Sequence, residues 1–316
     1  MSVRDGLENS EFDIPGPDAP SEPALVEGPA DRPQPLSLDE SRSTGEAYAE
    51  LRQRVEGEWE PRPFEAPRSE LGRFDPERAG LPPTSVDAAA KYVAEHRTAR
   101  PWLTMADTAS PEALRIIAAL DAGGGHGHIR HEGWVTEEAS MRRAAYREDP
   151  AQLDPEKRSL GIDGLGANDR PHRCASTSTR ITDPDAFATA FVRGVEHPKV
   201  REALDMPFDP RRKPRDVTIP IADLLGPDGH RYCTGWQLEP VDGSMKTAQT
   251  NRDAWLAARA EGWEQSFSEA QVRPVPTFEG GEIAFFFQRN DAEQRYEIVT
   301  IFPRPHHGKR QAISRS

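Results

Sequence analysis

The sequence predicts an α+β fold in which helices come first and a mainly antiparallel sheet closes with a C-terminal hairpin, after a disordered N-terminal region. Two observations lead to this prediction. Helical patterns dominate between residues 85 and 260, and the clearest pair of strand patterns lies at 282–302. Helices and strands that are grouped rather than alternating indicate an α+β fold, not repeated βαβ units.

The first 70 residues differ in composition from the rest of the chain. They hold 17 acidic and 7 basic residues and ten prolines, within a 316-residue chain whose net charge is -13. Such a segment buries too little apolar surface to offset the entropy lost on folding. We expect residues 1–75 to be a disordered acidic leader, with a helix at 45–56, and residues 76–109 to be a helical linker or a pre-domain.

Beyond the leader, the chain carries almost balanced charge, so nucleic acid is not excluded as a partner. No stretch approaches 18 apolar residues, and the first residues lack the apolar core of a secretory signal. We therefore expect a cytoplasmic protein as encoded, without a membrane partner, or one exported by a route other than Sec. Cys174 and Cys233 lack CxxC spacing, and we expect two buried free thiols.

The helices are predicted from caps and breakers. Residues 85–93 indicate a short helix, and 110–120 indicate a longer one with Ser110 as N-cap, Pro111 as the first helical residue and Gly123 as the stop.

The second half of the chain contains both helix patterns and strand patterns. Asp183 and Pro184 begin a helix that ends near Gly194. The other expected elements are helices at 137–148 and 245–260, a loop at 149–175, strands at 217–221 and 231–238, and a hairpin of strands 282–287 and 296–302 around the polar segment 288–294.

The most informative feature is a cluster of three histidines, His126, His128 and His131, which contains Arg130 and follows two glycines. Imidazole titrates near neutral pH, so two such groups can act as base and acid in one reaction. Arginine neutralises charge on a phosphate, and glycines allow close backbone approach to it. These groups suit phosphodiester transesterification, which yields a 2′,3′-cyclic phosphate.

Two other interpretations of the cluster stay open: the histidines are structural, or they ligate zinc. The sequence offers no HExxH motif, no cysteine partner and no acidic ligand at a matching spacing. We therefore expect neither a metal nor a cofactor.

A family resemblance adds to this interpretation. The segment Gly124-Gly125-His126-Gly127-His128-Ile129-Arg130-His131-Glu132-Gly133 resembles the GGHxxx[KR]HxG signature of the RNase A-like toxin domains of bacterial contact-dependent growth-inhibition proteins. The Ser/Thr-rich stretch 176–183, followed by a helix, is also similar to that family. So is the terminal Thr300-Ile301-Phe302-Pro303, in which Phe302 replaces the family's tyrosine and cannot donate a hydrogen bond.

The resemblance covers residues 110–305 and implies a compact domain that cleaves RNA without metal. It implies His126 as the principal catalytic imidazole, Arg130 or His131 as its neighbour, and Thr300 as a hydrogen-bond donor to the phosphate. The expected substrate-binding residues are His128, Thr179, Thr182 and Phe302. The expected partners are RNA and, in a producing bacterium, a cognate immunity protein. Residues 306–316 are expected to be a flexible basic tail.

Two further functions remain as alternatives. Residues 173–178 resemble the Ser-Thr-Ser element of ADP-ribosyltransferases, which use NAD, with Glu293 or Glu297 as the acidic residue. No Glu-x-Glu or Gln-x-Glu pair stands downstream, however. The other alternative is a non-enzymatic interaction protein that recruits its partner through the acidic leader.

Overall fold

A computed structural model describes residues 62–82, 84–166 and 168–306, with isolated positions between 46 and 54. All of these belong to one compact unit, Ser41–Ser316. Most of the expected acidic leader, seven of the twelve positions of the expected helix at 45–56, and the tail beyond residue 306 lie outside the described residues; the five described positions of 45–56 are helical.

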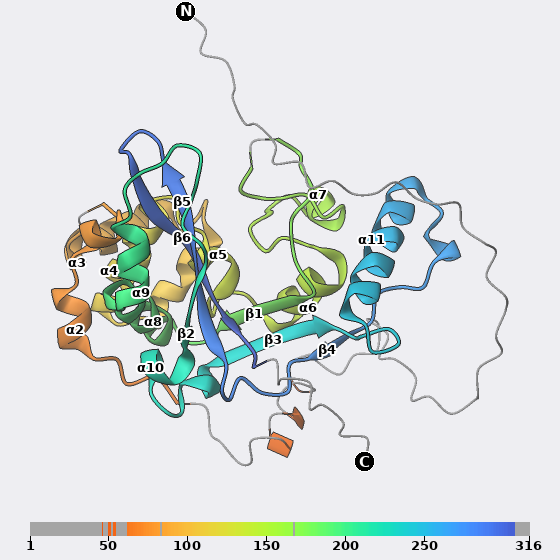
Figure 1. Cartoon of the computed structure of the whole chain (residues 1–316), viewed down its shortest axis with the longest axis horizontal. Helices are drawn as coiled ribbons and strands as arrows, with labels where there is room; N and C mark the ends of the chain where they lie inside the picture. Colours follow the sequence, from red (N-terminus) through yellow and green to blue (C-terminus); the bar gives the residue numbers. More distant parts are fainter. Residues whose placement is uncertain are drawn as a thin grey trace, which may run out of the picture. The chain divides into compact units, whose positions relative to one another are not determined.

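The helices of the described chain range from five residues in α5, α7 and α10 to 17 residues in α11 (Figure 1). The α-helices are α2 (Arg68–Arg73), α3 (Val86–His96), α4 (Pro111–Ala122), α5 (Gly127–His131), α6 (Glu137–Tyr146), α7 (Pro155–Ser159), α8 (Pro184–Glu196), α9 (Pro198–Leu204), α10 (Ile221–Leu225) and α11 (Met245–Glu261). Short 3-10 turns are η1 (Pro76–Ala79), η2 (Pro101–Asp107), η3 (Gly229–Tyr232) and η4 (Glu264–Ser266).

The strands form two antiparallel sheets, so the expected α+β class is confirmed. They are β1 (Thr177–Ile181), β2 (Val217–Pro220), β3 (Cys233–Leu238), β4 (Val272–Pro274), β5 (Glu282–Asn290) and β6 (Arg295–Arg304). One sheet has the order β1-β3-β4 and the other has the order β2-β5-β6. Helix α6 packs on the first sheet and α5 packs on β6.

The predicted caps form the predicted hydrogen bonds. The Ser110 hydroxyl accepts from the N–H of Ala113, and the Asp183 carboxylate accepts from the N–H of Ala186. The Ser110 N–H also donates to Asp185 at 2.9 Å, which ties the beginnings of α4 and α8 together. Capping depends on residues close in sequence, and for this reason these helix starts can be predicted.

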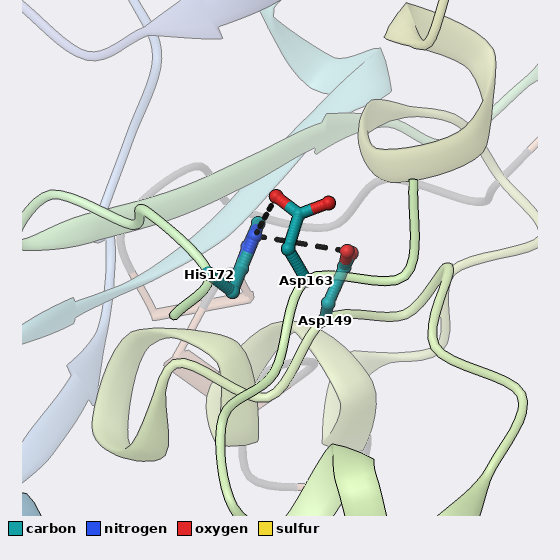
Figure 2. A group of neighbouring side chains, drawn as sticks. All are labelled: Asp149, Asp163 and His172. Atoms are coloured by element: carbon teal, nitrogen blue, oxygen red, sulfur yellow. Dashed lines mark ion pairs between the residues drawn. The ribbon is translucent and has the colours of Figure 1, made fainter. Parts of the chain in front are cut away.

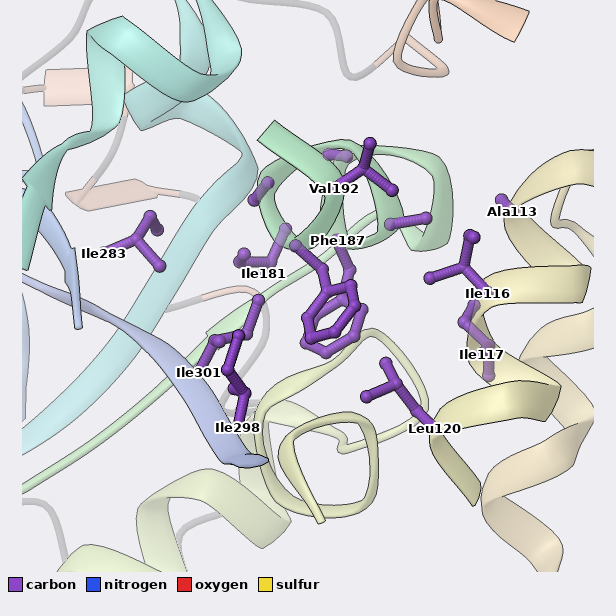
Figure 3. Close-up of a cluster of buried hydrophobic side chains, with 14 of the residues drawn as sticks. Ala113, Ile116, Ile117, Leu120, Ile181, Phe187, Val192, Ile283, Ile298 and Ile301 are labelled. Carbon is purple, nitrogen blue, oxygen red and sulfur yellow. The ribbon is translucent and has the colours of Figure 1, made fainter. Parts of the chain in front are cut away.

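The main hydrophobic core lies between α4, α8 and the strands (Figure 3). Ile116 and Ile117 of α4, Phe187 of α8 and Ile181 of β1 are all 0% exposed. Burial of each such side chain stabilises the fold by about 1.5–3 kcal/mol. The position of α4 is therefore fixed by packing on one face as well as by its cap.

The folded region begins earlier than the sequence predicts. Leu71 and Leu103 are both 0% exposed and belong to the same core cluster as the residues of α4. Both the 62–75 end of the expected leader and the expected linker 76–109 therefore pack on the domain. The sequence did not predict this packing, because these few buried side chains lie in a region with a low overall content of apolar residues.

Two other features complete the fold. Cys174 and Cys233 are both buried, as expected. No helix in the described part of the chain combines the length and apolar character needed to cross a membrane.

Candidate active site

The histidine segment, residues 124–133, forms the turn after α4 and the short helix α5. Gly123 caps the end of α4, and Gly124 has a left-handed backbone with a φ of 76°, where the chain reverses. The N–H of His126 then donates to the carbonyl of Val299 at 2.9 Å. This bond fixes the beginning of α5 on strand β6.

Two other glycines let α5 approach its neighbours closely. A Cβ on Gly127 would lie 3.0 Å from the backbone nitrogen of Ile301, and a Cβ on Gly133 would lie 2.4 Å from the carbonyl oxygen of Thr182. Side chains essentially never tolerate the second distance. Gly133 therefore allows the end of the histidine segment to contact the beginning of α8.

We expect Gly133→Ala to lower the free energy of unfolding by at least about 2 kcal/mol, because the new methyl group collides with backbone that cannot move cheaply. Urea unfolding measures the effect. Gly72→Ala is the matched control, since its Cβ would meet only the Glu112 Cγ, at 3.8 Å. Equal unfolding midpoints for the two variants would contradict the close approach at Gly133.

His126 is the half-buried N-cap residue of α5, and its imidazole makes no hydrogen bond within the described chain. Burial lowers the pKa of His126 to about 3, and the nearby positive charges of Arg130 and Arg143 act in the same direction. The imidazole is therefore neutral at physiological pH, and both ring nitrogens keep their hydrogen-bonding capacity. It is in the form that a general base requires.

Thr300 lies next to this histidine on β6. It follows Val299, whose carbonyl binds the His126 N–H, and its Cα would be 3.4 Å from a Cβ on Gly127. The Thr300 side chain is 8% exposed, and its buried hydroxyl has no hydrogen-bond partner in the described structure. An unpartnered buried hydroxyl is costly unless something uses it.

His131 joins three segments that are distant in sequence. Its Nδ1 lies 2.6 Å from the Thr179 carbonyl of β1, and its ring stacks on Phe302 of β6 with centroids 4.7 Å apart. The Thr179 hydroxyl in turn donates to the Pro303 carbonyl at 2.6 Å. The histidine segment, the Ser/Thr-rich stretch and the Thr-x-Phe-Pro segment therefore meet in space.

His131 is nevertheless held as a structural residue. A carbonyl only accepts, so Nδ1 carries the proton and Nε2 is the acceptor, which faces Arg143 Nη1 at 3.5 Å. Burial lowers the pKa of His131 well below its ordinary value, and Arg143 adds to the effect. This imidazole positions β1 and β6, and it is not free to act as a catalytic acid.

Phe302, an expected substrate-binding residue, is part of an aromatic stack. Its ring is stacked between those of His131 and Phe286, and the Arg304 guanidinium lies 5.3 Å from the centroids of both phenylalanine rings. The side chain is half-buried, so one part of it remains available to a ligand.

Three of the expected site residues have other roles. His128 is 0% exposed, and its Nε2 lies 3.0 Å from an Asp121 oxygen. Asp121 also accepts from Tyr92, Arg100 and Trp102 and so forms a polar centre within the fold. His128 is therefore not placed to touch a substrate.

Thr182 is likewise structural, because its hydroxyl donates to the Tyr232 carbonyl at 3.1 Å, just before α8 begins. Arg130, which we expected near the phosphate, instead lies against two carboxylates. Its Nε donates to Asp149 at 2.9 Å, and its Nη2 is 3.2 Å from an oxygen of Asp163. The guanidinium influences His126 through its charge, not by facing the substrate.

Asp149, Asp163 and His172 form a cluster of potential metal ligands (Figure 2). The His172 Nδ1 lies 3.7 Å from Asp149 and 3.6 Å from Asp163, while its Nε2 accepts from Arg143 Nε at 3.1 Å. With Nε2 as the acceptor, the neutral ring carries its proton on Nδ1, the atom that faces the carboxylates. A metal ion would have to displace both that proton and Arg130, so the residues fit an internal ion-pair network better than a metal centre.

The zinc alternative based on the histidine segment meets a different obstacle. His128 is bonded to Asp121 and His131 is bonded to Thr179, on separate elements of the fold. Among the described residues, no group of metal ligands includes any histidine of this segment.

Glu132 is a residue of the segment to which the sequence assigns no role. It is 0% exposed, accepts from the N–H of Trp134 at 3.2 Å, and leaves its Oε1 without a partner. Burial raises the pKa of Glu132 to about 8, so this carboxyl group is largely protonated at neutral pH. No local pattern distinguishes such a buried acid from an exposed one.

Comparison with known protein families, curated proteins and solved structures finds no match to this chain. Function is therefore inferred from the residues of the site. These are the free imidazole of His126, the unpartnered hydroxyl of Thr300, the structural His131 and the aromatic surface of Phe302.

Proposed function

We propose that this chain is an endoribonuclease that cleaves RNA by metal-independent transesterification, with His126 as the general base. The observation that carries the proposal is the state of this imidazole. It is neutral, partly exposed and without a hydrogen-bond partner in the described structure, and it lies beside a strand on which Thr300 keeps an unpartnered hydroxyl. The resemblance of the histidine segment to the toxin family supports the same assignment.

In the proposed reaction, His126 takes the proton of the ribose 2′-hydroxyl, and the 2′-oxygen attacks the adjacent phosphorus. The bond to the 5′-oxygen breaks, leaving a 2′,3′-cyclic phosphate and a 5′-hydroxyl. Thr300 donates a hydrogen bond to a non-bridging phosphate oxygen. Because His131 is held by Thr179, a water molecule supplies the proton to the leaving oxygen, and the hydroxide that remains takes up the proton held by His126.

The charges around the site suit this chemistry. Arg130 and Arg143 are both buried near His126, and they favour the extra negative charge that develops on the phosphorus. A bound phosphate places a negative charge beside the imidazole and thereby raises its pKa towards neutrality. His126 is thus neutral in the free protein and becomes a better base when the substrate is bound.

Incubation of the purified chain with total RNA in EDTA tests the proposal. We expect cleavage that yields 2′,3′-cyclic phosphate ends, and we expect His126→Gln to reduce it about 10²–10⁴-fold, as for loss of a general base. His230→Gln is the matched control, because His230 lies in η3 and, within the described part of the chain, its side chain bonds only the Pro227 carbonyl. Intact RNA with a demonstrably folded wild-type chain would refute the proposal.

The pH dependence of cleavage is a second test of His126 as the general base. The pH profile of kcat/KM reports the pKa of the free protein, and a base works only when unprotonated. With the pKa of His126 at about 3, the rate should hold nearly constant from pH 7 to pH 5. An ordinary histidine pKa of 6.5 would lower the rate about 25-fold over that interval.

The transferase alternative has less support. The Ser178 and Ser140 hydroxyls bond each other at 3.1 Å in a buried position, and the Glu297 carboxylate accepts from Asn290 at 2.6 Å within the β5–β6 hairpin. These groups are engaged inside the fold, where NAD has no access to them. Consumption of NAD without loss of RNA would favour the transferase over the ribonuclease.

In a producing bacterium, a nuclease of this kind would need a cognate immunity protein. Expression in a bacterial host distinguishes the nuclease from an interaction protein. Toxicity that His126→Gln relieves supports the nuclease, whereas equal tolerance of both chains supports a binding role.

A further inference from the structure

A cavity of about 500 Å³ lies beside the ion-pair network of Asp149, Asp163 and His172, and His172 is common to both. It is lined by Arg147, Arg170, Pro171, His172, Arg173, Cys174 and Ala175. Its volume is within the range of small-molecule sites, about 300–1,000 Å³. The sequence predicts a loop at 149–175, and residues 173–175 of the lining also belong to the stretch that resembles the Ser-Thr-Ser element of ADP-ribosyltransferases.

The lining of the cavity is strongly positive. Three of its seven residues are arginines and none is acidic. Arg170 and Arg173 are exposed, and within the described structure neither side chain has an ion pair or a hydrogen bond. Unpaired guanidinium groups that share one hollow repel each other, so an anion between them is favourable.

Arg147 contributes a second, independent observation. It caps the end of α6 with a left-handed backbone, at a φ of 57°, where glycine is the usual residue. A non-glycine residue in this conformation costs about 1–2 kcal/mol. Its Nη2 pairs with Asp253 at 2.7 Å, and its buried Nε has no partner in the described structure. The strained backbone conformation of Arg147 places its guanidinium group at the cavity. Strained backbone conformations of this kind are concentrated at functional sites.

We propose that this cavity binds a phosphate group, held by Arg170 and Arg173 at its mouth and by Arg147 at its wall. The planar guanidinium group matches the oxygens of phosphate with paired hydrogen bonds. The cavity is larger than a free phosphate needs, so the group fits best as part of a nucleotide or of a nucleic-acid backbone. This site does not depend on the proposed cleavage at His126.

Titration calorimetry on the full chain tests the site with two probes, inorganic phosphate and an oligothymidylate made of DNA. The DNA lacks the 2′-hydroxyl and cannot be cleaved by transesterification, so binding is measured separately from the proposed activity. We expect Arg170→Ala/Arg173→Ala to weaken binding at least tenfold. Arg211→Ala/Arg215→Ala removes the same charge from exposed positions outside the cavity and should change binding less than threefold.

Arg147→Gly separates binding from folding. Glycine accepts the left-handed backbone without strain, so the thermal midpoint should be unchanged or higher, while affinity for the probe falls at least threefold. Binding of phosphate itself, or of the oligonucleotide alone, supports the site and tells which source of phosphate it prefers. Absence of binding by both probes, or equal losses in the cavity and control double variants, overturns the proposal.

Discussion

Replacement of Arg130 by methionine is expected to destabilise the fold by about 3–5 kcal/mol, the cost of leaving a buried charge without its partner. Asp149 is 0% exposed, and Arg130 is its closest cation. Burial opposes ionisation of Asp149, but the hydrogen bonds and charge of Arg130 hold its pKa below the ordinary value. Asp149 also accepts from the N–H groups of Ala151 and Gly164 and so organises the loop around it. Urea unfolding measures the loss.

A double variant shows whether this cost comes from the ion pair. Arg130→Met/Asp149→Asn removes both charges, and we expect it to be more stable than Arg130→Met alone, since the remaining side chain is no longer ionised. The opposite result is equally informative. If Arg130→Met unfolds like the wild type but loses RNA cleavage, this arginine contacts the phosphate, as the resemblance implied.

Glu132→Gln is expected to stabilise the chain at neutral and alkaline pH. In the folded state burial raises the pKa of Glu132 to about 8, whereas its ordinary value is 4.5. Above pH 4.5 the unfolded chain releases this proton and the folded chain keeps it. The wild type therefore loses stability as the pH rises from 4.5 through about 8. Glutamine has the same shape and cannot ionise, so the advantage of the variant grows to the order of 5 kcal/mol above pH 8.

Unfolding midpoints at pH 5 and pH 9 measure this difference. Glu138→Gln makes the same charge change at an exposed position of α6 and serves as the control. We expect the control to shift stability little at either pH. If Glu132→Gln instead destabilises the chain equally at both, then Glu132 is ionised in the folded state and its charge is stabilised by Arg180.

Much of the fold could be predicted because its signals are local. Ser110 and Asp183 bond the N–H groups of residues three positions ahead, and the β5–β6 hairpin joins strands separated by a short turn. Strand β1 gave no such signal. Four of its five residues are buried, so the alternation of an exposed strand is missing from Thr177–Ile181. The five-residue helix α5 was also too short for a periodic pattern.

For the candidate site, too, the sequence predicted some features and the tertiary structure decided the others. The sequence by itself determined that three histidines and an arginine lie together after a helix end. Its resemblance to the toxin family predicted that the distant Ser/Thr and Thr-x-Phe-Pro segments belong with them. Only the tertiary structure decided that His126 is free, while His128 is bonded to Asp121 and His131 to Thr179. The chemistry of an imidazole depends on its burial, its charged neighbours and its hydrogen bonds. Most of those are supplied by β1, β6 and the loop after α6, and folding alone brings them together.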